Sequence, residues 1–165
     1  MKNKKYIFLF TFLFFSNAFA ENIQIQARNI TLDKDKVTSI FENDVVVKTK
    51  NKIIKSQYVK YNKKIGLLIL KNDIKVEDSD NNVITTEKAE FNENEEIFKT
   101  FGPTNIITAE KYTVIGRDIV VNNKNKTISS NKLASINDLE GNYIELQNFN
   151  YQVKENIFKS IGSVK

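Results

Sequence analysis

The chain has 165 residues, with 25 Lys and Arg against 20 Asp and Glu, and it contains no His, Cys or Trp. Without His and Cys it lacks a Ser-His-Asp triad, a cysteine nucleophile, a disulfide framework and the usual zinc ligands. The basic residues are scattered among acidic ones, so the net charge of +5 does not indicate nucleic-acid binding. We therefore expect a protein that is not an enzyme, with no catalytic residues, metal or cofactor.

Residues 1–20 are predicted to be a cleaved signal peptide. Three lysines precede the apolar run Tyr6–Phe15, and the small residues Ala18 and Ala20 stand at the positions that a signal peptidase reads. Ten apolar residues are too few for a membrane span, which needs about 20. Cleavage before Glu21 would leave 22 basic against 20 acidic residues. We expect export to the periplasm, with association with the outer membrane as a further option.

Residues 21–165 are predicted to form one domain built from five repeats of about 30 residues. The repeats start 29, 30, 30 and 30 residues apart, and each has an aliphatic first, an apolar sixth and a large apolar eighth position. A fixed period of this length indicates that one structural unit is stacked. The first positions are Ile25, Ile54, Ile84, Val114 and Ile144, the sixth are Ile30, Val59, Ala89, Ile119 and Phe149, and the eighth are Leu32, Tyr61, Phe91, Val121 and Tyr151.

Each repeat is predicted to contain about two strands, because residues 23–27 and 74–78 alternate with a period of two and polar turns follow every dozen or so residues. The apolar positions slip by three residues inside each first strand. This slip indicates a bend or bulge that keeps one face turned inward. The polar segment 77–82 has acidic residues spaced like a calcium loop, but it lacks the Gly and Glu of such a loop and is predicted to be a hairpin turn.

Two all-β architectures fit this pattern. Short turns between consecutive strands favour two antiparallel sheets. The alternative is a right-handed parallel β-helix, in which Asn62, Asn92 and Asn122 would stack as a ladder. A β-helix would suggest an extracellular protein that binds or cleaves polysaccharide.

The repeated pattern resembles the OstA-like domain of lipopolysaccharide transport over residues 21–165. The residues that carry the resemblance are I-x-A-x-x-I-x-L-D at 25–33, I-x-S-x-x-V-x-Y-N at 54–62 and I-x-T-x-x-A-x-F-N at 84–92. The family includes a periplasmic bridge protein and the N-terminal domain of the outer-membrane translocon. Asn43-Asp44 and Asn72-Asp73 replace the Gly that the family usually has before its hydrophobic strand. The fifth repeat stops short, so both the complete bridge protein and a translocon fragment are expected alternatives.

The resemblance implies an open β-jelly roll, with two antiparallel sheets in a V, that shields lipid A acyl chains on their way to the outer membrane. The expected partners are lipopolysaccharide and other jelly-roll domains of the transport bridge, joined head to tail by strand addition. The candidate lipid-binding residues are those of the inward columns. They are Ile25, Leu32, Ile54, Val59, Tyr61, Ile84, Phe91, Val114, Ile119, Val121, Ile144, Phe149 and Tyr151.

Overall fold

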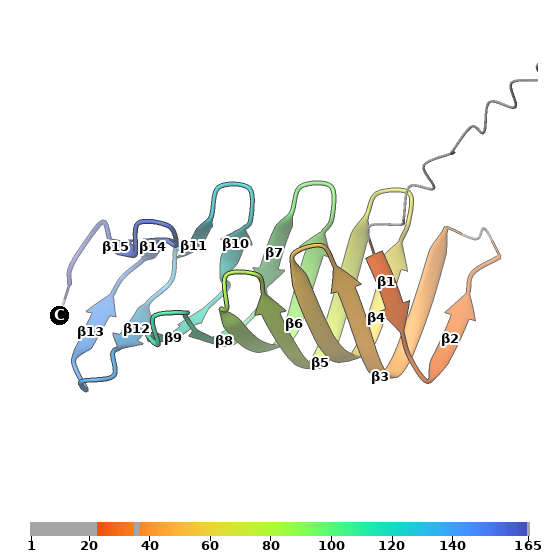
Figure 1. The fold of residues 1–165 in the computed structure, drawn as a ribbon, viewed down its shortest axis with the longest axis horizontal. Helices are drawn as coiled ribbons and strands as arrows, with labels where there is room; N and C mark the ends of the chain where they lie inside the picture. The colour runs from red at the N-terminus through yellow and green to blue at the C-terminus, as the bar shows by residue number, and fades with distance from the viewer. Residues whose placement is uncertain (1–22, 35–36, 165) are drawn as a thin grey trace, which may run out of the picture.

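The computed structural model describes residues 23–34 and 37–164, so the predicted signal peptide lies outside the described residues. These residues form 15 strands, and every pairing between them is antiparallel (Figure 1). In this part of the chain there is no helix with the length and apolarity that a bilayer crossing requires. The strands are β1 (Ile23–Gln26), β2 (Asn29–Leu32), β3 (Thr38–Thr49), β4 (Lys52–Asn62), β5 (Leu67–Asp78), β6 (Val83–Asn92), β7 (Ile97–Thr100), β8 (Pro103–Ile107), β9 (Thr113–Arg117), β10 (Val120–Asn122), β11 (Thr127–Ser130), β12 (Ala134–Asn137), β13 (Tyr143–Leu146), β14 (Phe149–Gln152) and β15 (Ile157–Lys159).

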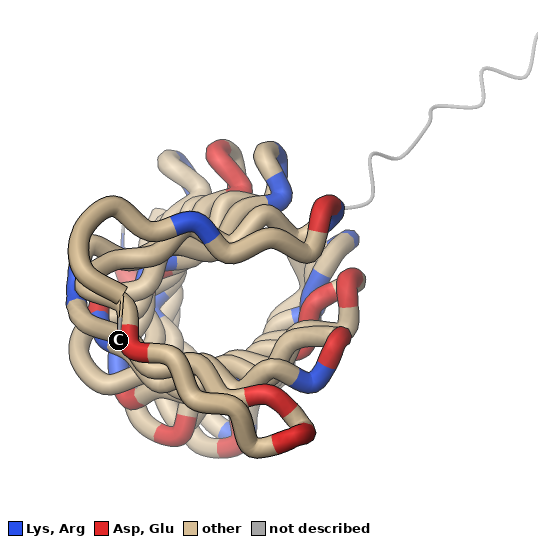
Figure 2. Tube along the Cα trace, turned by 90° about the vertical axis from the view of Figure 1, so that its left-hand side faces the viewer, with Lys and Arg blue, Asp and Glu red and all other residues tan. Residues whose placement is uncertain are grey.

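One continuous sheet is folded lengthwise into two half-sheets. The pairing register shifts in the middle of β3, β4 and β5, and later in the chain separate short strands stand on the two sides of the fold line. Along the long axis, the trace encircles an interior that side chains fill (Figure 2). The first half-sheet contains β2, residues 38–42, 58–62, 67–71 and 88–92 of β3 to β6, and β7, β10, β11, β14 and β15. The second contains β1, residues 45–49, 52–56, 74–78 and 83–86 of the same strands, and β8, β9, β12 and β13.

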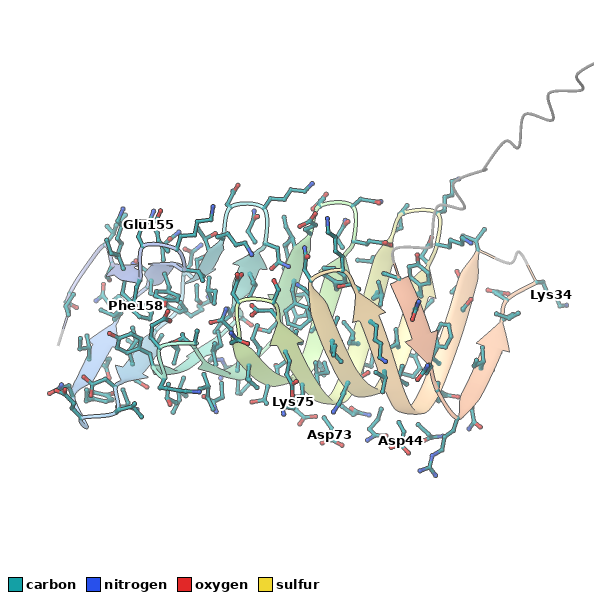
Figure 3. All side chains as sticks on the ribbon, in the orientation of Figure 1. Lys34, Asp44, Asp73, Lys75, Glu155 and Phe158 are labelled. Atoms are coloured by element: carbon teal, nitrogen blue, oxygen red, sulfur yellow. The ribbon has the colours of Figure 1, made fainter. Side chains whose placement is uncertain are left out.

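The fold line is made by residues in the left-handed backbone region. Asn43 and Asp44 have φ of 65° and 51°, and Asn72 and Asp73 repeat these values. Asn and Asp tolerate this region better than other residues with a side chain, which explains how they replace glycine here. Figure 3 shows Asp44 and Asp73 along the same edge of the fold. The bend predicted from the three-residue slip inside each first strand is present in β4, where the buried Ser56 and Val59 flank a register shift against both β3 and β5.

Buried hydroxyl groups satisfy the backbone where the later strands break at the fold line. The Thr100 Oγ1 atom accepts a hydrogen bond of 2.8 Å from the Ile119 amide and lies 2.7 Å from Thr104 Oγ1. The Ser130 hydroxyl donates to the Arg117 carbonyl at 2.6 Å. These breaks raise the strand number above the ten or so that the sequence predicted, because the ladder is interrupted at each later bend.

The β-helix alternative is wrong. Asn62, Asn92 and Asn122 do not stack in a ladder, because each lies at the start of a tight turn between antiparallel strands. The side-chain oxygen of Asn62 accepts from the amides of Lys64 and Ile65 at 3.0 and 3.4 Å. The side-chain oxygens of Asn92 and Asn122 accept from the amide three residues further on, at 3.1 and 3.0 Å. With this fold excluded, the polysaccharide-cleaving or polysaccharide-binding alternative loses its structural basis.

A single apolar core runs between the half-sheets for the length of the molecule. Both half-sheets supply it, since Val47 and Ile54 face Leu68, Leu70 and Phe98, and all five are fully buried. Residues between them on the same strands point to water, as the two-residue period of a strand requires. The all-β, antiparallel, open jelly-roll architecture predicted from the sequence is therefore the observed one.

Candidate functional site

Most of the predicted lipid-binding residues line this shared interior. Ile25 and Tyr61 are half-buried, and Leu32 and Ile144 are 67% and 43% exposed. The remaining nine are buried in the core and are contributed by strands of both half-sheets. They are Ile54, Val59, Ile84, Phe91, Val114, Ile119, Val121, Phe149 and Tyr151.

The two exposed members lie on the inward face of strands at the ends of the molecule. Leu32 belongs to β2, which pairs on one side with β3 and leaves its other side without a strand among the described residues. At the far end Ile144 lies opposite the buried Ile136 of β12. On its other side, β13 is paired within the described residues by a single bridge between Leu146 and Val164. The interior is therefore apolar up to both ends of the sheet, where its side chains meet water.

Opposite the fold line, two rows of turns face each other and form what we call the mouth. The turns of the first half-sheet span residues 62–66, 92–96, 122–126 and 152–156, and those of the second span 49–52, 78–82, 108–112 and 138–142. In the first half-sheet, backbone hydrogen bonds join neighbouring turns, such as that of 2.8 Å from the Glu93 amide to the Gly66 carbonyl. In the second half-sheet, the Ser79 amide donates to the Asn51 carbonyl at 2.8 Å, and the Ala109 amide donates to the Asn82 side-chain oxygen at 3.3 Å. We call each row of turns a lip.

Side chains join one lip to the other. Lys126 Nζ lies 2.5 Å from Asp80 Oδ2, and the Tyr151 hydroxyl donates to Glu110 Oε2 at 2.8 Å. Burial raises the pKa of Tyr151, and the Glu110 carboxylate adds to this effect. The Tyr151 ring also stacks on Phe158, with ring centroids 4.2 Å apart. The Lys126–Asp80 and Tyr151–Glu110 contacts cross the mouth, whereas the ring stack lies within the first half-sheet.

The turn at 78–82 is the polar hairpin that the sequence predicted. Asp78 Oδ1 accepts from the amides of Asp80 and Asn82, both at 2.9 Å, and Oδ2 accepts from the Asn82 side-chain amide at 2.9 Å. Both oxygens of the Asp78 carboxylate therefore accept hydrogen bonds within their own turn.

Sequence reasoning missed Lys52, the first residue of β4. Its side chain points inward and is 5% exposed, and Nζ lies 4.6 Å from the centroid of the Phe91 ring and 5.8 Å from that of Phe98. Burial lowers the pKa of Lys52 from 10.5 to about 8, although the negative charges of Asp78 and Glu96 oppose the change. The signal that could have found it is its position two residues before Ile54, on the inward face of the strand.

Lys52 lines a pocket of about 270 Å³ in the mouth. The lip of the second half-sheet contributes Thr49, Lys50, Asn51 and Lys52, and the first half-sheet contributes Phe91, Glu93, Glu96 and Asn123. One wall is therefore basic and the other is acidic, and the apolar core begins at the Phe91 ring.

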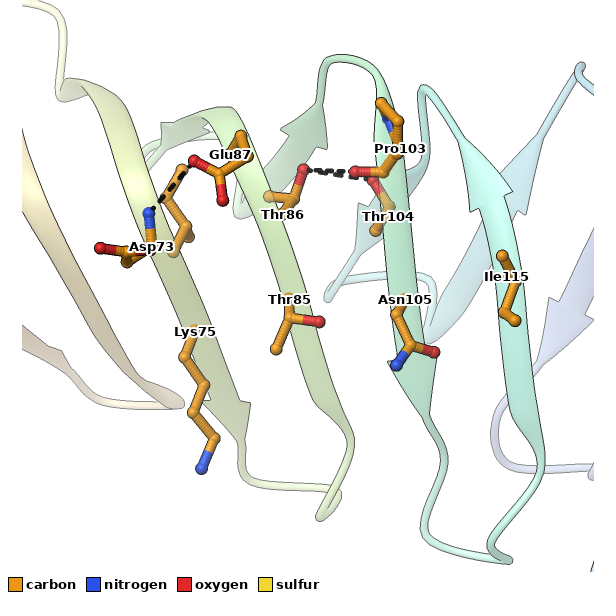
Figure 4. Close-up of a pocket in the computed structure, with 10 residues that line it drawn as sticks. Asp73, Lys75, Thr85, Thr86, Glu87, Pro103, Thr104, Asn105 and Ile115 are labelled. Carbon is orange, nitrogen blue, oxygen red and sulfur yellow. Dashed lines mark hydrogen bonds between the residues drawn. The ribbon is translucent and has the colours of Figure 1, made fainter.

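A separate groove of about 570 Å³ lies on the outer face of the second half-sheet, beside the fold line (Figure 4). Lys75, Thr85, Asn105 and Ile115 project there from four neighbouring strands. None of the predicted lipid-binding residues lines this groove. These four side chains belong to the outward face, so the groove opens away from the interior.

Comparison with solved structures finds a similarity to LptH from Pseudomonas aeruginosa, described as the LptA homologous periplasmic component of the lipopolysaccharide transport device. The match covers 86% of this chain and 82% of that chain, with 15% identity and a TM-score of 0.34. No protein-family model and no curated protein matches the sequence. At these values the similarity carries no argument about function, which rests on the geometry and sequence pattern of the chain itself.

Proposed function

We propose that the protein is a periplasmic carrier that shelters the acyl chains of lipopolysaccharide between its half-sheets during transport to the outer membrane. The observation that carries the proposal is the apolar interior, which extends to both ends of the sheet and is lined by the repeated inward columns. The resemblance of these columns to the OstA-like pattern supports the choice of ligand. The role is binding without catalysis.

The physical need for such an interior follows from the cost of exposing hydrocarbon to water, about 0.8 kcal/mol for each methylene group. Several long acyl chains therefore require a continuous apolar surface to cross an aqueous compartment. The largely apolar inner face of each half-sheet provides that surface.

Acyl chains enter only if the half-sheets separate, because the interior side chains pack against one another. The hydrogen-bonded backbone holds the half-sheets together at the fold line and holds each lip together lengthwise. Across the mouth, the described residues show side-chain contacts, such as Lys126 with Asp80. An ion pair of this kind, with side chains 27% and 34% exposed, contributes about 1 kcal/mol or less. Opening at the mouth is therefore the least costly way to admit a ligand.

The sheet ends are proposed to join other domains of the same fold. β1 and β2 lie at one end and β13 and β15 at the other, and strand addition would supply partners for their outer backbone groups. The two ends differ, so a contact between them is head-to-tail and repeats without closing. The interiors of successive domains would then form one apolar path.

Photo-crosslinking tests the proposal. A photoreactive residue at Tyr61 faces the interior, whereas the same residue at its neighbour Lys60 faces water. We expect lipopolysaccharide to be captured at Tyr61 and not at Lys60, because adjacent strand residues point to opposite faces. Equal capture at both positions would indicate non-specific adhesion, and capture at neither, with lipopolysaccharide present, would assign the inward columns to core packing alone.

A further inference from the structure

The mouth pocket is lined by Lys52, whose side chain is largely buried and whose ammonium group makes no hydrogen bond to the described part of the protein. The Lys52 ammonium group carries three N–H donors. In the part of the chain that the structure describes, its nitrogen contacts the faces of Phe91 and Phe98 and makes no hydrogen bond or ion pair. Asp78, directly opposite on β5, directs its carboxylate to its own turn. Burying a charge without a partner is unfavourable, so a ligand that pairs with this cation would gain free energy.

The pocket lies at the boundary between the apolar interior and water. The Phe91 ring forms its inner side and continues into the core, while Asn51 and the exposed Lys50 form its outer rim. A ligand with a hydrocarbon chain and a charged head would therefore find both environments within the length of one molecule.

The opposite wall sets a condition on the ligand. Glu93 and Glu96 balance the charges of Lys50 and Lys52, so the pocket as a whole does not concentrate free anions. Glu93 also accepts a hydrogen bond of 3.3 Å from the Tyr61 hydroxyl, which holds it on the first half-sheet. An anion is retained here only when an attached chain anchors it.

We propose that the mouth pocket binds the phosphate headgroup of an acyl-chain amphiphile, with Lys52 Nζ donating to a phosphate oxygen while the chain lies in the interior. This inference rests on the proposed function, because it requires that the interior accepts an acyl chain. It adds a residue that selects the headgroup, whereas the apolar columns select only for hydrocarbon.

Binding of a phosphate at this site should change the protonation of Lys52. The pKa of Lys52 is about 8 in the unliganded protein, and the charged groups that act on it are Asp78 on β5, Glu96 beside β7 and Lys126 beside β11. A bound phosphate stabilises the protonated amine and raises this pKa. Binding near pH 8 therefore takes up a fraction of a proton, while binding at pH 6, where Lys52 is already protonated, takes up almost none.

Isothermal titration calorimetry of the whole chain tests the inference with two amphiphiles of equal chain length. One is a lysophosphatidylglycerol, a phosphate diester whose charge is constant across this pH range, and the other is an uncharged alkyl maltoside. Titrations at pH 8 and pH 6, each in two buffers of different ionisation heat, measure affinity and proton uptake together. Inorganic phosphate is the third ligand.

We expect the phosphate diester to bind about tenfold or more tightly than the maltoside, with proton uptake at pH 8. Lys52→Met should remove both the preference and the uptake, whereas Lys55→Met, at an outward-facing position on the same strand, should retain both. The comparison of ligands and of pH values on the unmodified protein needs no variant, so it is informative even if Lys52→Met fails to fold.

Equal affinity for the two amphiphiles, with no proton uptake, would overturn the headgroup site and leave the interior as the acyl-chain site. Binding of neither would overturn the carrier function and this inference together. Inorganic phosphate binding as tightly as the diester would show a site for free anions and would also contradict the proposal.

Discussion

Replacement of Lys52 by Met should stabilise the fold at neutral pH. In the native state the charged amine is buried against Phe91 and Phe98, whereas in the unfolded chain it is hydrated. The pKa of about 8, against 10.5 in the unfolded chain, means that protonated Lys52 destabilises the native state by roughly 3 kcal/mol. Met fills a similar volume without charge. We expect the free energy of unfolding at pH 7 to rise by about 2 to 3 kcal/mol.

The pH dependence gives the same reasoning an independent test. Between pH 8 and 10.5 the unfolded chain holds a proton on Lys52 that the native protein has released, so the stability of the unmodified protein should increase as pH rises through this window. Lys52→Met should lack this increase. Burial also raises the pKa of Tyr151, which lowers stability once unfolded tyrosines ionise near pH 10, so measurements stop at pH 9.5.

Urea unfolding followed by far-UV circular dichroism at pH 7.0, 8.5 and 9.5 measures both effects. Lys55→Met is the control, because Lys55 is exposed on the outward face of β4 and its replacement should change stability by less than about 0.5 kcal/mol. A loss of stability for Lys52→Met at pH 7, with an unchanged pH dependence, would refute the view that this cation is buried at a cost.

Three further perturbations address the bends, the buried hydroxyls and the sheet ends. Asn72→Val should lower the free energy of unfolding by about 1 to 2 kcal/mol while Asn72→Gly is tolerated, because φ is 65° at this position; equal effects in urea unfolding would contradict the role of the bend. Thr104→Val should cost about 1 to 2 kcal/mol, since it removes a buried hydroxyl that lies within hydrogen-bonding distance of three oxygens, and Thr85→Val on the outer face should cost less than about 0.5 kcal/mol; similar losses for the two would refute the hydroxyl cluster. In sedimentation velocity the protein should form open chains as concentration rises, and Leu32→Asp and Ile144→Asp should each weaken them. A mixture of these two variants should stop at dimers, because only the unaltered end of one variant can join the unaltered end of the other. An unmodified protein that stays monomeric at high concentration would argue against end-to-end joining.

The bends could be read from the sequence because they are local. A slip of three residues between apolar positions has one physical solution in a strand, a bulge that returns the next side chain to the inner face. On β5, which pairs with the slipped strands β4 and β6, Asn72-Asp73 occupy the position of the usual glycine and adopt the left-handed conformation that the bend needs. The interior faces of the strands followed from the same columns.

The features that sequence reasoning missed depend on neighbours distant in the chain. Lys52 is buried because Phe91 and Phe98, about 40 residues further along the chain, cover it from the opposite half-sheet, and the pattern of a single strand contains no such information. Leu32 and Ile144 are exposed because each lies on an end strand. The two-residue period of a strand predicts which way a side chain points, whereas its burial also requires a neighbouring strand that covers it.

The opening of the mouth on ligand binding tests the central claim most directly. The chain has no cysteine, so spin labels can be attached to introduced pairs of cysteines alone. The pair Ser79→Cys with Asn125→Cys measures the distance across the mouth, and the pair Glu95→Cys with Asn125→Cys measures the distance along one lip. In pulsed electron paramagnetic resonance, added lipopolysaccharide should increase the distance across the mouth by about 4 Å, the van der Waals thickness of one layer of carbon atoms. The distance along the lip should stay constant. An unchanged distance across the mouth, in protein shown to carry bound lipopolysaccharide, would contradict the proposal that acyl chains lie between the half-sheets.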